Sequence, residues 1–193
     1  ESFTTALDQI LDVYDANWTK RSGQLNVIAA SDDCYPSAPA SLHYWSGDAF
    51  NADHYAQAKY NAITASSIYL GVATRATAGA SSGDAYYFFA STVDSYFGTY
   101  NDGSFADIGG DRGVFAVNDV IRCEWSGTTW TLKKNGGTLA SGTDSTFSTG
   151  AAGIISYSNS STERIDDWEG GNTAGGGSTG PPAQTLMMMG CGI

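Results

Sequence analysis

Two neighbouring segments of strictly alternating residues constrain the fold of this chain more than any other feature. Asp119–Ser126 and Thr128–Lys134 place apolar and polar side chains in turn, with Ser126-Gly127 between them and Asn135-Gly136 after them. A period of two is the signature of a half-buried β-strand, and Asn-Gly favours a tight hairpin turn. The predicted inward positions of this hairpin are Ile121, Cys123, Trp125, Trp130 and Leu132.

The rest of the chain continues in short strand-like segments separated by turn residues. The further predicted strands are Trp18–Ile28, Ser41–Trp45, Tyr55–Ile63, Ile68–Ala76, Tyr86–Ala90, Ser95–Tyr100, Thr138–Ser141, Gly153–Ser158 and Glu163–Glu169. Residues 31–40 and 101–113 are predicted as loops, and the spacing of Leu7, Ile10, Leu11 and Tyr14 predicts a short helix. Turns every 8–12 residues or so predict an all-β, two-sheet antiparallel jelly-roll sandwich.

Composition narrows the classes of partner. The 193 residues carry a formal net charge of −11, which disfavours nucleic acid and anionic membranes. No apolar run approaches the roughly 20 residues of a membrane span, and the opening residues lack the pattern of a signal peptide. The sequence does not say whether Glu1 is a processed N-terminus.

The cysteines do not form a recognisable framework. There are three, Cys34, Cys123 and Cys191, and no Cys-x-x-Cys pair occurs. An odd count argues against a disulfide scaffold. Cys123, on the apolar side of its strand, is interpreted as a buried inert thiol, and a Cys34–Cys123 bridge is left open.

The last residues differ in composition from the rest. Residues 1–169 are assigned to the sandwich, residues 170–182 to a Gly/Pro-rich linker ending at Pro181-Pro182, and residues 183–193 to an apolar extended tail. The tail is expected to dock on a neighbouring subunit, the alternative being that it covers an edge of its own sandwich. The expected subunit contacts are Leu186, Met187, Met188 and Met189.

Four segments carry a family resemblance. Ala16–Gly23, Phe50–Gln57, Asp119–Gly137 and Glu163–Glu169 resemble strands of concanavalin A-like, or laminin-G-like, jelly rolls of the type found in bacteriophage and environmental bacterial proteins. The resemblance covers most of residues 14–170. It implies the fold more firmly than a function, because such domains include carbohydrate-binding modules and virion surface proteins.

Paired carboxylates are relevant because glycoside hydrolases occur on this fold. Glu163, Asp166 and Glu169 are similar to the glucanase pattern E-x-D-x-x-E, but their spacing differs. On a regular strand Asp166 points away from Glu163 and Glu169, whereas Asp167 shares their face; a bulge would change this. Solvated acids on a closing strand are therefore the preferred interpretation.

Two other chemical motifs are weak. Gly79–Gly83 matches G-x-S-x-G by letters, but strands are predicted on both sides, so it is interpreted as a hairpin loop. The two histidines, His43 and His54, have no evident triad partner.

Binding sites remain as candidates. Aromatic rings stack on the apolar faces of sugars, and the strand rings that qualify are Tyr44, Trp45, Tyr86, Tyr87, Tyr96, Tyr100 and Trp130, of which Tyr44, Trp45, Tyr86, Tyr96 and Tyr100 are retained. Alternation across Tyr86–Phe89 predicts rings on both faces of that strand. No cofactor is expected other than Ca²⁺, for which the candidate ligands are Asp102, Asp107 and Asp111 in a loop that also holds Asn101. Ordinary turn chemistry is the preferred interpretation of these residues.

Together these observations predict a non-enzymatic structural or surface protein of a larger assembly. The leading form of this hypothesis is a phage virion decoration or appendage subunit, at a virion surface or outside the cell, with neighbouring subunits as partners. The alternatives are a secreted or surface carbohydrate-binding module and, third, a glycan-cleaving enzyme of the same fold.

Overall fold

The computed structural model describes residues 8–28, 30–64 and 68–173. Within these residues the chain forms antiparallel strands and one helical turn, and no helix there is long and apolar enough to cross a membrane. The elements are β1 (Gln9–Ile10), α1 (Leu11–Tyr14), β2 (Trp18–Val27), β3 (Cys34–Trp45), β4 (His54–Ala62), β5 (Leu70–Thr77), β6 (Asp84–Ala90), β7 (Ser95–Asn101), β8 (Ser104–Asp107), β9 (Val120–Ser126), β10 (Thr129–Lys134), β11 (Gly137–Thr143), β12 (Ala151–Ser156) and β13 (Arg164–Asn172).

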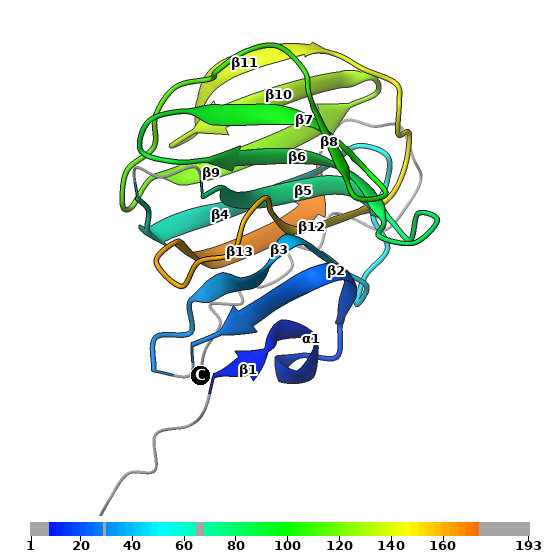
Figure 1. Cartoon of the computed structure of the whole chain (residues 1–193). Helices are drawn as coiled ribbons and strands as arrows, with labels where there is room; N and C mark the ends of the chain where they lie inside the picture. Colours follow the sequence, from blue (N-terminus) through cyan, green and yellow to red (C-terminus); the bar gives the residue numbers. More distant parts are fainter. Residues whose placement is uncertain (1–7, 29, 65–67, 174–193) are drawn as a thin grey trace, which may run out of the picture.

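The strands form a curled sheet that packs against itself as two layers (Figure 1). One layer, the β4 sheet, has the order β11-β10-β9-β4-β13; the other, the β6 sheet, has the order β3-β12-β5-β6-β7-β8, with β2 and β1 added beside β3. Strand β3 joins the layers, because Cys34 pairs with Ile165 of β13 while Ser41 and the following residues pair with β12. The predicted all-β, two-sheet antiparallel jelly-roll sandwich is confirmed.

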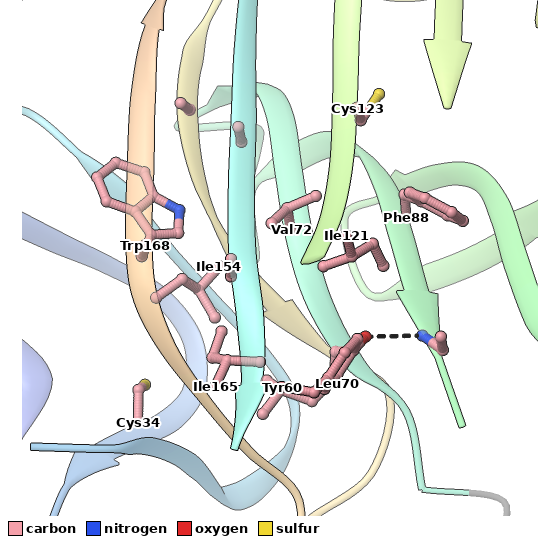
Figure 2. Packing of buried hydrophobic residues seen from close by; sticks show 14 of the residues in the cluster. Cys34, Tyr60, Leu70, Val72, Phe88, Ile121, Cys123, Ile154, Ile165 and Trp168 are labelled. Carbon is pink, nitrogen blue, oxygen red and sulfur yellow. Dashed lines mark hydrogen bonds between the residues drawn. The ribbon is translucent and has the colours of Figure 1, made fainter. Parts of the chain in front are cut away.

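The core lies between the two layers. Figure 2 shows Ile121 and Cys123 of the β4 sheet facing Val72 and Phe88 of the β6 sheet. The predicted inward set of the first hairpin, Ile121, Cys123, Trp125, Trp130 and Leu132, is at most 5% exposed throughout, so this part of the prediction is confirmed.

The buried hydroxyl of Tyr60 has hydrogen-bond partners inside the core. Tyr60 is completely buried; its hydroxyl donates to the carbonyl of Leu70 at 2.5 Å and accepts from the backbone N–H of Ala90 at 3.2 Å. These bonds link β4 to both β5 and β6 across the sandwich. A buried hydroxyl that lacked such partners would destabilise the fold.

Both predicted loops contain strands. Residues 34–40, predicted as loop, belong to β3, and Ser104–Asp107 forms the hairpin partner of β7. Pro36 and Pro39 are tolerated in β3 because they lie between its last pairing with β13 and its first pairing with β12, where the strand has β2 alone as a neighbour.

The predicted boundaries of the domain also shift. Strand β13 continues through Gly170, Gly171 and Asn172, which pair with β4, so these three residues belong to the sheet and not to a linker. The predicted helix reduces to α1, with Ile10 in β1 and Leu7 outside the described residues. The tail contacts expected of Leu186, Met187, Met188 and Met189 also lie outside the described residues.

Cys123 is a buried free thiol, as expected, so the Cys34–Cys123 bridge that was left open does not form. Burial is the main reason that the pKa of the Cys123 thiol rises to about 12. A thiol held in its neutral form in this way is a poor nucleophile and a poor metal ligand.

Candidate functional site

The outer face of the β6 sheet carries a second aromatic cluster, separate from the core. Along β6, Tyr86 and Phe88 point into the core, whereas Tyr87 and Phe89 belong to the outer cluster. The rings of Tyr87 and Phe89 are stacked with centroids 4.4 Å apart. The predicted appearance of rings on both faces of this strand is therefore confirmed.

A glycine allows the Tyr87 ring to lie across the neighbouring strand. Gly98 of β7 pairs with Tyr87 on one side and with Asp107 of β8 on the other. A methyl group on Gly98 would lie 2.5 Å from the Tyr87 hydroxyl and would also strike the Ala106 carbonyl. Without that methyl group, the Tyr87 hydroxyl reaches Asp107 and donates a hydrogen bond to Oδ1.

Two further rings come from chain segments that lie far apart in the sequence. Tyr69 precedes β5 and Tyr157 follows β12, and the antiparallel pairing of β5 with β12 brings them together: the Tyr157 N–H donates to the Tyr69 carbonyl at 3.0 Å. The Tyr69 ring stacks on Phe89 at 5.1 Å and meets Tyr157 edge-on at 6.2 Å. Strand pairing has thus extended the aromatic surface beyond β6.

These side chains line a groove of about 400 Å³ on the outer face of the β6 sheet, hereafter the aromatic groove. Its volume is within the range of small-molecule binding sites. Tyr157 is the most exposed of its rings, at 49%. The lining residues are Tyr69, Tyr87, Phe89, Tyr96, Phe105, Asp107 and Tyr157.

Carboxylates fix the orientation of three of these tyrosines. Oδ2 of Asp94 accepts hydrogen bonds from the hydroxyls of Tyr69, at 3.0 Å, and Tyr96, at 3.2 Å, as Asp107 does from Tyr87. Burial and then these hydrogen bonds raise the pKa values of Tyr69 and Tyr87, and the bond to Asp94 is the main cause of the raised pKa of Tyr96. All three phenols therefore remain protonated donors at neutral pH.

Such a surface suits the binding of a sugar. Flat rings offer apolar contact area to the C–H faces of a pyranose or furanose, and carboxylate oxygens accept hydrogen bonds from its hydroxyls. Both kinds of group occur together in the aromatic groove. Orientation by strands and by hydrogen bonds means that little side-chain freedom is lost when a ligand binds.

The five retained ring candidates are divided among three places. Tyr96 lines the aromatic groove; Tyr44 and Tyr100 lie on the same outer face but do not line it. For Trp45 and Tyr86 the prediction is wrong, because both side chains are in the core and at most 5% exposed. Trp45 packs against Trp18 and Tyr86 against Trp125, so neither ring can stack on a sugar.

The two other strand rings that qualify by sequence lie in different places: Tyr87 lines the groove, whereas Trp130 belongs to the core. The sequence reasoning missed the other lining rings, Tyr69, Phe89, Phe105 and Tyr157. Of these, Phe89 could be predicted from the alternation of side chains along the strand, because it shares a face with Tyr87.

The three aspartates considered for Ca²⁺ do not converge. Asp102 accepts from the backbone N–H groups of Ser81 and Ser82, Asp111 accepts from that of Ser95, and Asp107 serves Tyr87. No cluster of three or more metal-ligating side chains occurs among the described residues. The three candidate ligands are therefore not brought together, and turn and strand chemistry accounts for each of them.

A bulge changes the placement of the acids on β13. The pairing with β4 shifts between Asp166 and Glu169, and Asp167 has φ +49°. Asp166 now pairs with Lys59 and Glu169 with Gln57, two positions apart on β4, so both carboxylates face outward. The arrangement expected of a regular strand, with Asp166 pointing away from Glu169, is therefore wrong, and the alternative of a bulge is confirmed.

These acids are far from the arrangement of the glucanase pattern. Glu163 was expected to be a solvated acid on the closing strand, which is wrong: it is fully buried and accepts hydrogen bonds from Thr64 and Thr162. Glu169 accepts from Tyr55 and Gln57 on the outer face of the β4 sheet, whereas the aromatic groove lies on the other layer.

The other motifs have structural roles. Gly79–Gly83 lies in the β5–β6 hairpin connection, as predicted. His54 is buried between the Asn51 carbonyl and the Arg75 backbone N–H, and buried His43 has Asp12 at 3.6 Å. Desolvation lowers the pKa of both imidazoles to about 4.

Comparison with known proteins gives the fold its name. No family model and no curated protein sequence matches the chain. Among solved structures it is similar to the carbohydrate binding module CBM66 from Bacillus subtilis, with 14% identity and a TM-score of 0.58 over 77% of this chain and 90% of that one.

Two further structures are similar at the level of fold. A protein of unknown function with a galectin-like fold from Bacillus subtilis has 8% identity and a TM-score of 0.54 over 81% of this chain and 92% of that one. The carbohydrate recognition domain of Emp46p has 8% identity and a TM-score of 0.50 over 78% and 84%. At such identities the likeness concerns architecture, and it shows that this chain has the lectin-like, concanavalin A-like jelly-roll fold that its sequence resembles.

Proposed function

We propose that this protein binds carbohydrate in the aromatic groove. The observation that carries the proposal is the convergence of six rings and a carboxylate on the outer face of the β6 sheet. Aromatic stacking with a few oriented polar groups is the usual composition of a small-ligand site. The presence of a carbohydrate-binding module and a carbohydrate recognition domain among structures of this fold agrees with it.

Binding without cleavage is part of the proposal. Glycoside hydrolysis requires an acid and a second carboxylate flanking one bond. In the aromatic groove, Asp107 and the neighbouring Asp94 both accept hydrogen bonds from tyrosines, which suits a positioning role. The outward acids of β13 belong to the opposite layer.

A glycan array probed with the purified chain tests this function. We expect a defined set of glycans to be retained, and incubation with those glycans to release no reducing ends. An array on which nothing binds above background would contradict the proposal.

A second candidate is a structural subunit of a larger assembly, at a virion surface or outside the cell. Its support is the sequence alone: Leu186, Met187, Met188 and Met189 form an apolar run after Pro181-Pro182. Such adaptable side chains suit a partner groove. Deletion of residues 181–193 should leave the melting temperature nearly unchanged and abolish self-association in light scattering; unaltered association would contradict this candidate.

A further inference from the structure

We infer that the aromatic groove selects glycans without acidic substituents, and that Asp107 receives hydrogen bonds from sugar hydroxyls there. This inference rests on the proposed function and names the class of ligand. Two observations support it: most donors of the groove already make hydrogen bonds within the protein, and the charged groups at the groove are negative.

Most tyrosine hydroxyls of the groove already donate a hydrogen bond within the protein. Of the four tyrosines that line the groove, Tyr87 donates to Asp107, whereas Tyr69 and Tyr96 donate to the adjacent Asp94. Tyr157 is the lining tyrosine with no such bond among the described residues. The groove therefore offers few donors, and a ligand has to bring its own.

Acceptors are what the groove has in excess. Asp107 is exposed at the groove, and Oδ2 takes no hydrogen bond from the described part of the chain. A sugar hydroxyl is both donor and acceptor, so it can donate a hydrogen bond to this oxygen of the carboxylate. The carboxylate of a uronate, or a sulfate group, can only accept hydrogen bonds and would place its oxygens against those of Asp107.

Charge acts in the same direction. The residues that line the groove are aromatic or acidic, and Asp94 adds a second carboxylate behind Tyr69 and Tyr96. The whole chain carries a net charge of −11. An anionic glycan would lose solvation and gain repulsion on entering such a groove.

The test compares chemically matched polysaccharides. The neutral polysaccharide that the array identifies is converted into a carboxymethyl derivative and, as a control for size, into a hydroxyethyl derivative. Affinity electrophoresis then gives the dissociation constant for each. We expect the carboxymethyl derivative to bind about tenfold more weakly than the hydroxyethyl derivative at low salt, and the difference to narrow as salt screens the charges.

Two variants with the same change in charge locate the effect. In Asp107→Asn the amide oxygen can still accept from Tyr87, but the negative charge is gone, so the preference for the hydroxyethyl derivative should fall severalfold. Asp167→Asn removes a carboxylate that pairs with Lys59 on the outer face of the β4 sheet, and it should keep the wild-type preference.

The outcomes separate the inference from the proposed function. Equal binding of the two derivatives, tighter binding of the carboxymethyl form, or an unchanged preference in Asp107→Asn would overturn the inference while glycan binding stands. If no neutral or acidic polysaccharide binds the wild-type chain, the proposed function fails and the inference fails with it.

Discussion

The hydroxyl of Tyr87 on β6 donates a hydrogen bond to Asp107 on β8, across the intervening strand β7. The bond crosses at Gly98, where no side chain blocks the phenol ring. It thereby couples the floor of the aromatic groove to an edge strand that carries its carboxylate.

Gly98→Ala should therefore disturb both stability and binding. The new methyl group would lie 2.5 Å from the Tyr87 hydroxyl and would strike the Ala106 carbonyl, and such overpacking destabilises by about 1–3 kcal/mol. Thermal melting and glycan titration would measure the two effects. Gly110→Ala is the matched control, because a methyl group there meets nothing within 4 Å; equal behaviour of the two variants would contradict the account.

Trp130→Ala should strongly destabilise the fold. The Trp130 ring is 5% exposed and lies 4.6 Å from that of Phe97 on the opposite layer. Removal of a buried Trp side chain costs about 3–5 kcal/mol of the free energy of unfolding. Urea denaturation should show this loss, whereas exposed Thr129→Ala on the same strand should not; an unchanged midpoint would remove Trp130 from the core.

The fold was predictable where local alternation and turn residues carried the information. Ile121, Trp125 and Leu132 alternate with polar neighbours, and that pattern alone gave their placement. Strand β8 was missed because Ser104–Asp107 is four residues long and follows the turn signal Asn-Asp-Gly; its pairing with β7 defines it as a strand.

The aromatic groove was less predictable for a topological reason. Tyr69 and Tyr157 are single rings beside strands, and nothing in their surroundings marks them as partners. They meet because β12 inserts between β3 and β5, a choice made by long-range pairing. The bulge at Asp167 is similar, since one extra residue reverses the face of Asp166 without a sequence signal strong enough to reveal it.

Stability should fall in acid before the carboxylates titrate. Burial lowers the pKa of both His43 and His54 to about 4, so the unfolded chain binds protons more readily than the folded one. Each neutral histidine contributes fully to the free energy of unfolding above a pH of about 6.5. This contribution is lost as the pH falls toward 4, at up to about 1.4 kcal/mol per pH unit.

Imidazole proton resonances followed against pH would measure this directly. We expect both midpoints near 4, and the free energy of unfolding at pH 5 to be lower than at pH 7. A midpoint near 6.5 for either histidine would show that its ring is not desolvated as described.

The acids of the closing segment should be dispensable for glycan binding. Glu163 is buried against Thr64 and Thr162, and Glu169 is held by Tyr55 and Gln57 on the layer opposite the groove. Glu163→Gln and Glu169→Gln should bind the array-identified glycan as the wild type does, and no variant should release reducing sugar from β-glucans. Reducing-sugar release that disappears in either variant would contradict the proposal of binding without cleavage.

Titration calorimetry of Tyr157→Ala against the array-identified glycan tests the central claim most directly. Tyr157 is a groove ring that is 49% exposed, so its removal should barely change stability. Loss of one stacking face should weaken binding about tenfold, which corresponds to about 1.4 kcal/mol. Tyr55→Ala, on the outer face of the β4 sheet, should bind like the wild type. Undiminished affinity in Tyr157→Ala, or an equal loss in Tyr55→Ala, would show that the glycan is not bound in the aromatic groove.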